Sequence, residues 1–199
     1  MKTFPLIASI VFLLGAGFAV AQKPATQKAP ETFRVSFDTS KGPVVIEVTR
    51  ALAPNGADHF YTLVKAKYYD GARFFRVIPG FMAQFGLAAS PAATKTWEAS
   101  IQDDPVKTSN VRGAVTFAQT SAPNSRSTQL FINFGNNAFL DGQRFAPFGK
   151  VVSGMEIVDQ IYSGDGEKPD QGRITAEGNA YLEKAFPRLD YIKTARIAE

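Results

Sequence analysis

The chain has 199 residues, of which 45% are hydrophobic, 12% aromatic and 20% charged. This composition is typical of a globular protein with one sizeable core, and it excludes a disordered or collagen-like chain. The lack of cysteine excludes a disulfide scaffold, thiolate metal sites and cysteine nucleophiles, and the single histidine excludes a multi-histidine metal centre. The net charge of +4 is scattered without a run of lysine or arginine, so nucleic acid is not an expected partner.

The N-terminal segment has the pattern of a secretory signal. Lys2 precedes an apolar run at residues 6–20, and an Ala-x-Ala motif ends this segment at residues 19–21. A positive start, an apolar run and a small-residue exit predict a signal peptide over residues 1–21, cleaved after Ala21. An uncleaved membrane anchor is the alternative, although the run is shorter than the roughly 20 residues that span a bilayer. We therefore expect a secreted or periplasmic protein that is not stably inserted in a membrane.

Residues 22–31 (QKPATQKAPE) are polar, contain two prolines and show no apolar period, so they predict a flexible tether. No internal repeat, low-complexity tract or second linker follows. The sequence therefore predicts one folded domain over residues 32–199.

The first elements of this domain are well marked. Thr32–Asp38 and Pro43–Arg50 alternate β-branched and polar residues on either side of a short turn, which predicts a hairpin. Apolar residues then recur at the spacing i, i+3, i+4, i+7 from Ala57 to Val64, which predicts an amphipathic helix. Asn55 or Asp58 is placed to cap the start of this helix.

The rest of the domain reads mainly as short strands. The strand-like runs are Arg73–Ile78, Phe81–Phe85, Ala114–Gln119, Gln129–Asn133, Pro147–Val152 and Tyr191–Ile197. A second short helix is predicted at Gly154–Ile161. This pattern indicates a mainly β protein, a closed or nearly closed antiparallel barrel with helices at its open ends. Periodicity alone does not distinguish such a barrel from a sandwich.

Three stretches carry residues that suggest chemistry. They are Phe74–Gly86, Thr128–Asn133 and Ala138–Gly142. Alternation along a strand places Met82 with Gln84 on one face, and Gln129 with Phe131 on one face. Arg76 leads the first stretch, so the three together offer one cation, two amides and several apolar side chains.

These stretches, the run at residues 145–151 and the order of the elements resemble the cyclophilin family of peptidyl-prolyl cis–trans isomerases. The resemblance extends from about Phe33 to Ile197. It implies a closed eight-stranded antiparallel β-barrel capped by two α-helices, with no cofactor. It also implies catalytic roles for Arg76 and Gln84, and proline-containing peptides or folding proteins as partners. The substrate-binding residues that it implies are Phe81, Met82, Ala118, Gln119, Thr120, Gln129, Phe131, Phe139 and Leu140.

The sequence departs from the best-known family members at several positions. Phe75 stands where many members have histidine, and Phe139 replaces a tryptophan that contributes to cyclosporin binding. We therefore expect weak cyclosporin binding at most. The short loops are more similar to bacterial members. Outside the matching stretches, Asp103-Asp104 before Pro105 predicts a solvated turn.

The chemistry of proline isomerisation fits these residues. Amide resonance opposes rotation of the X-Pro bond with a barrier of roughly 18–20 kcal/mol, and the twisted midpoint turns the proline nitrogen into a hydrogen-bond acceptor. A donor aimed at that nitrogen stabilises the transition state more than either planar state, and the guanidinium of Arg76 suits that role. No nucleophile is required.

The leading expectation is a monomeric isomerase that assists the folding of exported proteins. One alternative is a proline-peptide-binding chaperone or adaptor with weak or no turnover. Another is a barrel that carries a small apolar ligand, although an interior of Phe, Ile and Val leaves little room for one.

Overall fold

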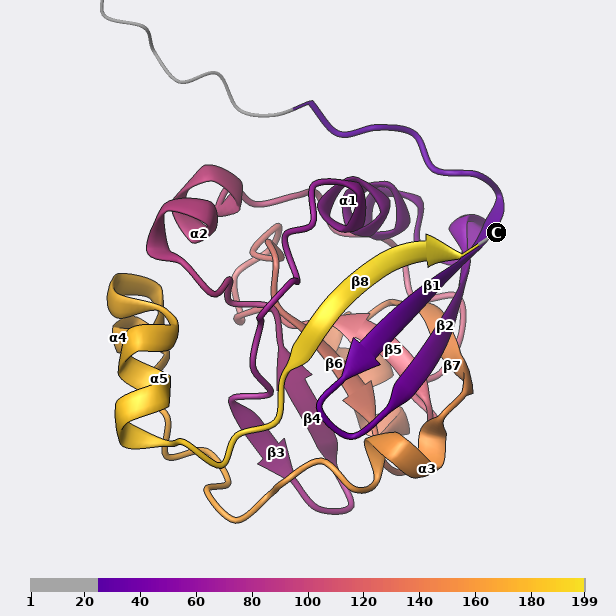
Figure 1. Cartoon of the computed structure of the whole chain (residues 1–199). Coiled ribbons are helices and arrows are strands. Elements are labelled where there is room, and N and C mark those ends of the chain that lie inside the picture. Colours follow the sequence, from indigo (N-terminus) through magenta and orange to yellow (C-terminus); the bar gives the residue numbers. More distant parts are fainter. Residues whose placement is uncertain (1–24, 199) are drawn as a thin grey trace, which may run out of the picture.

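The computed structural model describes residues 25–198, so the predicted signal peptide and its cleavage site lie outside the described residues. Eight antiparallel strands form one curled sheet (Figure 1). The strands are β1 (Thr32–Thr39), β2 (Pro43–Thr49), β3 (Arg76–Ile78), β4 (Met82–Phe85), β5 (Ala114–Phe117), β6 (Leu130–Asn133), β7 (Pro147–Ser153) and β8 (Ile192–Ala198). Their order across the sheet is β3-β4-β6-β5-β7-β2-β1-β8. The predicted hairpin is present as the β1–β2 pair.

The closed barrel that we expected is not confirmed. Within residues 25–198 the sheet ends at β3 and β8, and no ladder joins these two strands. The segments that precede them meet through a single bridge between Arg73 and Tyr191 and through backbone hydrogen bonds such as Phe74 N–H to the Asp190 carbonyl, 2.9 Å. The physical reason is that β3 has only three residues, too few to pair along the full length of β8. The sheet is therefore a curled half-barrel.

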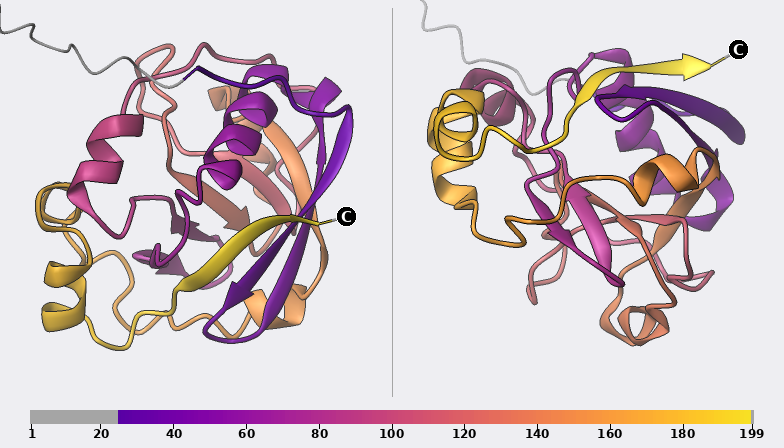
Figure 2. Two further views of the ribbon diagram at one scale, coloured as in Figure 1. Left: turned by 45° about the horizontal axis from the view of Figure 1, so that its top comes forward. Right: turned by 60° about the horizontal axis from the view of Figure 1, so that its bottom comes forward.

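More helices surround the sheet than the two that were predicted. They are α1 (Pro54–Lys65), α2 (Pro91–Trp97), α3 (Met155–Val158), α4 (Gln171–Glu177) and α5 (Asn179–Ala185), with 3-10 helices η1 (Arg50–Leu52) and η2 (Ala138–Gln143). The second predicted helix shrinks to the single turn α3. In the views of Figures 1 and 2, α4 and α5 stand together to one side of the sheet, away from α1. Across residues 25–198, every helix is too short or too polar to cross a membrane.

The first helix is capped from a distant part of the chain. It begins at Pro54, and the Asp104 carboxylate accepts hydrogen bonds from the backbone N–H groups of Asn55 (3.0 Å) and Gly56 (2.9 Å). The prediction of a local cap by Asn55 or Asp58 is therefore wrong, since Asp104 satisfies two of the free N–H groups at this helix start. The solvated turn expected at residues 103–104 is wrong for the same reason, because Asp104 is buried.

Part of the predicted tether is packed on the domain. The backbone N–H of Gln27 donates to the Thr62 hydroxyl and that of Ala29 donates to the Asp58 carboxylate, both at 2.8 Å. Ala29 itself is buried. The flexible tether expected over residues 22–31 is thus corrected for residues 27–29, because α1 offers acceptors that fix this backbone.

The core lies on the concave face of the sheet. One residue from each of four neighbouring strands forms a row across it, and all four are buried: Val77, Ala83, Ile132 and Val115. Aromatic rings fill the space between this face and α1, with ring centroids 5.1 Å apart for Phe60 and Phe148 and 5.7 Å apart for Phe37 and Phe85. These rings occupy the volume in which an apolar ligand would have to lie, which disfavours the ligand-carrier alternative.

Candidate active site

A second row of side chains crosses the opposite face of the same strands. Arg76 in β3 pairs with Gln84 in β4, and Gln84 pairs with Phe131 in β6. Successive residues of a strand point to opposite faces, so this row is set back to back with the buried core row. The alternation of these short strands therefore delivers a cation, an amide and an aromatic ring to one patch.

A chain of polar contacts orders this row. An Nη1–H of Arg76 donates to Gln84 Oε1 at 3.3 Å, and Gln84 Nε2 donates to Gln129 Oε1 at 2.8 Å. On its other side, the Arg76 guanidinium contacts Oε2 of Glu167, at 3.0 Å from Nε and 2.9 Å from Nη2. The Arg76 side chain is 30% exposed. A permanently charged fork is thus held at the surface by groups on both sides.

An apolar pocket lies next to this cation. Met82, Phe131 and Leu140 form a buried cluster that is separate from the main core, with Phe81, Ala118 and Phe145 packed against it. The pocket has a volume of about 350 Å³. Its lining residues are Arg76, Phe81, Met82, Gln84, Ala118, Gln119, Thr120, Ser125, Ser127, Gln129, Phe131, Leu140, Phe145 and Gln171.

The structure brings together every residue of the predicted site except Phe139. Phe139 is 60% exposed and stacks on the pocket residue Phe81, with ring centroids 6.0 Å apart. Its place in η2 directs the ring outward, so it lies beside the pocket and does not line it. The roles of these residues in catalysis and binding remain predictions.

Sequence reasoning did not assign four of the lining residues to the site. Ser125 and Ser127 precede Gln129 at intervals of two, and this period could have placed them on its face. Phe145 follows η2, and its ring packs edge-on against Phe131 at 5.8 Å. Gln171 begins α4, a helix that was not predicted although Asp170 caps its start.

Buried amides support the pocket from behind. Asn137 Nδ2 donates to the Phe81 carbonyl and to Asn133 Oδ1, at 2.8 and 2.7 Å. Asn110 donates through its backbone and side chain to the Asp141 carboxylate, which belongs to η2. Burial alone would raise the pKa of Asp141, but the hydrogen bonds from Ser109 and Asn110 hold it below its ordinary value. These bonds fix Phe81 and η2 relative to the strands.

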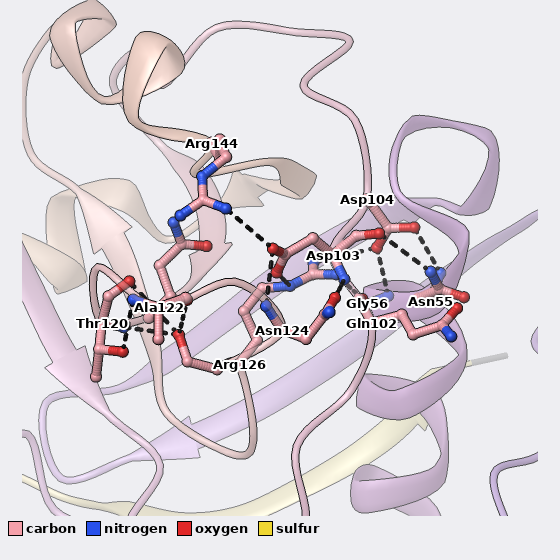
Figure 3. Close-up of polar contacts among 12 residues, drawn as sticks. Asn55, Gly56, Gln102, Asp103, Asp104, Thr120, Ala122, Asn124, Arg126 and Arg144 are labelled. Atoms are coloured by element: carbon pink, nitrogen blue, oxygen red, sulfur yellow. Dashed lines mark hydrogen bonds and ion pairs between the residues drawn. The ribbon is translucent and has the colours of Figure 1, made fainter.

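A network of charged groups holds the opposite wall, the loop at residues 119–127 (Figure 3). Asp103 and Asn124 exchange hydrogen bonds, Asp103 N–H to Asn124 Oδ1 (2.8 Å) and Asn124 N–H to Asp103 Oδ2 (2.9 Å). Arg126 pairs with both Asp103 (3.4 Å) and Asp104 (3.1 Å). Arg144 donates to the Ser121 carbonyl at 3.0 Å and pairs with Asp103 at 3.6 Å. The Asp103-Asp104 pair therefore connects this loop to α1 and to η2.

The arrangement suits binding and rotation of a proline-containing peptide. The apolar pocket can take a small ring, while the guanidinium and the amides offer hydrogen-bond donors at its edge. In the part of the chain that the structure describes, no three His, Asp or Glu side chains gather as a metal site. Rotation of an amide requires neither a nucleophile nor proton transfer.

Comparisons with known proteins identify the family of this chain. Residues 34–178 match the family model described as "Cyclophilin type peptidyl-prolyl cis-trans isomerase/CLD". Peptidyl-prolyl cis-trans isomerase A of Dickeya dadantii is 37% identical over 161 residues, which cover 78% of this chain and 83% of that protein. A probable peptidyl-prolyl cis-trans isomerase of Brucella abortus is 37% identical over 167 residues, with 76% and 84% covered.

Solved structures show the same fold. A cyclophilin type peptidyl-prolyl cis-trans isomerase of Cryptosporidium parvum has a TM-score of 0.64 at 22% identity, covering 84% of this chain and 98% of that one. The Cryptosporidium protein was also solved in the presence of the dipeptide Ala-Pro, with a TM-score of 0.64 and 22% identity, covering 83% of this chain and 99% of that one. With the sequence match, the eight-stranded half-barrel and the pocket in agreement, the chain belongs to the cyclophilin-type peptidyl-prolyl cis-trans isomerases.

Proposed function

We propose that this isomerase accelerates X-Pro rotation in exported proteins as they fold, with Arg76 as the donor that stabilises the twisted bond. The observation that carries the proposal is the position of the Arg76 guanidinium beside the apolar pocket, oriented by Gln84. Uncatalysed proline isomerisation takes tens to hundreds of seconds, which is slow enough to limit folding.

The guanidinium keeps free donors for this task. Of its five N–H groups, three are engaged, by Gln84 and by Glu167. The remaining two are available to a proline nitrogen that loses its resonance and becomes an acceptor. Because this acceptor is present only in the twisted state, the hydrogen bond from Arg76 lowers the barrier to rotation and does not merely tighten peptide binding.

The remaining pocket residues supply the clamp. We propose that Met82, Phe131 and Leu140 hold the proline ring, while the wall at residues 118–120 holds the preceding residues of the peptide. With one end fixed, rotation moves the other end. Phe139 is exposed beside the pocket and offers a smaller surface than tryptophan, which supports our expectation of weak cyclosporin binding.

The proposal of export is supported by the signal-like pattern of residues 1–21. The mature protein is then expected to begin at Gln22 and to act as a monomer. N-terminal sequencing of the protein recovered from secreting cells tests the cleavage. A mature chain that still begins at Met1 would contradict it.

The activity is tested by NMR exchange spectroscopy on an Ala-Pro or Phe-Pro peptide. We expect the parent to accelerate cis–trans exchange and Arg76→Ala to lose about 10²–10³-fold, the cost of removing one pre-organised donor. Arg112→Ala is the matched control, because Arg112 is an exposed arginine whose ion pair, with Asp159, lies outside the pocket. Binding without acceleration by the parent would favour the chaperone or adaptor alternative. Equal acceleration by Arg76→Ala would remove the proposed mechanism.

A further inference from the structure

The edge of the sheet that carries Arg76 is covered by a segment late in the chain. We call this segment the 162–190 unit; it comprises the loop at residues 162–170 and the helices α4 and α5. The backbone N–H of Val77 in β3 donates to the Gly166 carbonyl at 3.0 Å. Since β3 is an end strand of three residues, an uncovered edge would leave its backbone groups unpaired and its position poorly fixed.

The 162–190 unit has its own apolar contacts with the sheet. Phe75 and Leu87 pack in one buried cluster with residues of α4 and α5 and their flanking loop, namely Ile174, Tyr181, Leu182 and Leu189. Phe75 directly precedes Arg76 and is fully covered. This packing explains why an aromatic residue stands at a position where many family members have histidine.

A tight turn fixes the unit to the body of the protein at a second point. Gly178 separates α4 from α5 with φ +62°, and a Cβ there would lie 2.5 Å from the Ala89 carbonyl oxygen. The next residue, Asn179, donates from its backbone to that carbonyl at 2.9 Å and from its side chain to the Gly71 carbonyl at 3.0 Å. The unit is therefore a packed part of the fold and can hold side chains in defined positions.

Two polar side chains of this unit reach the active site. Glu167 contacts the Arg76 guanidinium at Nε and Nη2, and Gln171 lines the pocket. With Gln84 on Nη1, the guanidinium is held from both sides, which fixes the plane of the fork and the direction of its free N–H groups. An arginine side chain without such partners would distribute over several rotamers.

We infer that Glu167 is a positioning residue of the isomerase, which orients the Arg76 guanidinium toward the twisted X-Pro bond. This inference rests on the proposed role of Arg76. An exposed ion pair adds little to folding stability, so the effect of Glu167 falls on the rate and not on the fold. A carboxylate that merely occupied the guanidinium would act with the opposite sign, and its removal would speed the reaction.

The chain provides a matched control. Glu183 in α5 belongs to the same unit and pairs with Arg73 at 3.2 Å, three residues before Arg76. Its side chain is 63% exposed, against 65% for Glu167. Glu183→Ala therefore removes the same charge and the same kind of contact without touching the guanidinium of Arg76.

The test measures kcat, KM and thermal unfolding for the full chain and its variants. We expect Glu167→Ala to lower kcat on the order of tenfold with KM and the melting temperature unchanged, because a misplaced donor costs rate. Glu167→Gln should fall between Glu167→Ala and the parent, because its amide oxygen can still accept from Nε. Glu183→Ala should match the parent within twofold.

Salt separates positioning from a purely structural role. Ions screen an exposed pair, so added salt should lower the parent kcat toward that of Glu167→Ala while the variant itself stays level. An unchanged or higher kcat in Glu167→Ala, or a change confined to KM, would overturn the inference. A parent that binds the peptide but does not accelerate exchange would overturn the proposed function and this inference with it. If the parent and Glu167→Ala accelerate exchange equally, the inference alone is overturned and the proposed function stands.

Discussion

The two walls of the pocket are each organised by an arginine, and the two arginines differ in their surroundings. Arg126, within the 119–127 loop, has a side chain only 1% exposed and faces two carboxylates, of which Asp104 is equally buried. Arg76, on the β3 wall, is partly exposed and faces the single exposed carboxylate of Glu167. One pair is locked inside the protein and the other is open to solvent.

With the proposed role of Arg76, this difference separates folding from catalysis. Water cannot replace a buried partner, so losing one member of the Arg126 network leaves an uncompensated charge inside the protein. Water can replace an exposed partner, so losing Glu167 changes orientation at little cost in stability. The position of the 119–127 loop therefore depends on the stability of the whole fold. The geometry of the wall at β3 depends on the orientation of one side chain, Arg76.

Removing the buried cation should have the largest effect on stability. Arg126→Met leaves the buried carboxylate of Asp104 without its cation and Asp103 with Arg144 alone, and it should lower the free energy of unfolding by about 3–5 kcal/mol. Denaturant titration measures this change. Arg112→Met, which breaks the exposed pair with Asp159 (2.6 Å), is the control and should cost less than about 1 kcal/mol. Similar losses in the two variants would erase the contrast between buried and exposed pairs.

Releasing the loop from η2 should have an intermediate effect. Arg144 connects Ser121 to Asp103 at the surface, so Arg144→Ala frees the 119–127 loop, the wall proposed to bind the peptide, without leaving a buried charge unpaired. We expect KM for a proline peptide to rise a few-fold while kcat stays near the parent value, as for a loss of uniform binding. Arg34→Ala, which breaks the exposed pair with Glu47, is a control outside the pocket. A fall in kcat at constant KM would instead assign Arg144 to the rotation step.

Acidification should have the smallest effect. Burial would raise the pKa of Asp141, but bonds from Ser109 and Asn110 lower it below 3.8, so its ionised form is favoured in the folded state. This contribution to stability is complete above the unfolded pKa and is lost as pH falls through the folded pKa. The difference in melting temperature between the parent and Asp141→Asn at pH 6 should therefore shrink as the pH falls through the lowered folded pKa of Asp141. A constant difference across this range would show that ionisation of Asp141 is not the cause.

Features with a local pattern were predictable from the sequence. The β1–β2 hairpin and α1 follow from periods of 2 and 3.6. Alternation also placed Met82 with Gln84 and Gln129 with Phe131, whereas the assignment of these residues to a pocket came from the family resemblance. To bring Arg76, Gln84 and Phe131 into one row, the fold needs only to pair the three neighbouring strands in this register. Local residues are enough for the hairpin and the helix because each depends on which face of the element a side chain occupies.

Features that depend on distant partners were not predictable. Asp103-Asp104 looked like a solvated turn because both of its partners are distant in the sequence. Its cation, Arg126, lies on a later loop, and α1, which Asp104 caps, lies much earlier in the chain. The helices α4 and α5 have seven residues each and are separated by Gly178, too short for a helical period to stand out. A capping residue for α4 was present, since the Asp170 side chain accepts from Arg173 N–H at 2.8 Å, but α5 has no side-chain cap. No sequence pattern assigned Glu167 to the site, because only the fold brings it to Arg76.

The 162–190 unit, which covers β3, also determines when the complete site can form during synthesis. Arg76 and Glu167 are 91 positions apart, and β1 pairs with β8, the last strand within residues 25–198. A chain emerging from a ribosome or a membrane channel exposes Arg76 long before it exposes the segment that holds it. A copy synthesised only to residue 160 therefore carries the pocket residues of β3, β4 and β6 without Glu167, and the contacts that hold the Arg76 guanidinium on both sides form only after the 162–190 unit has emerged.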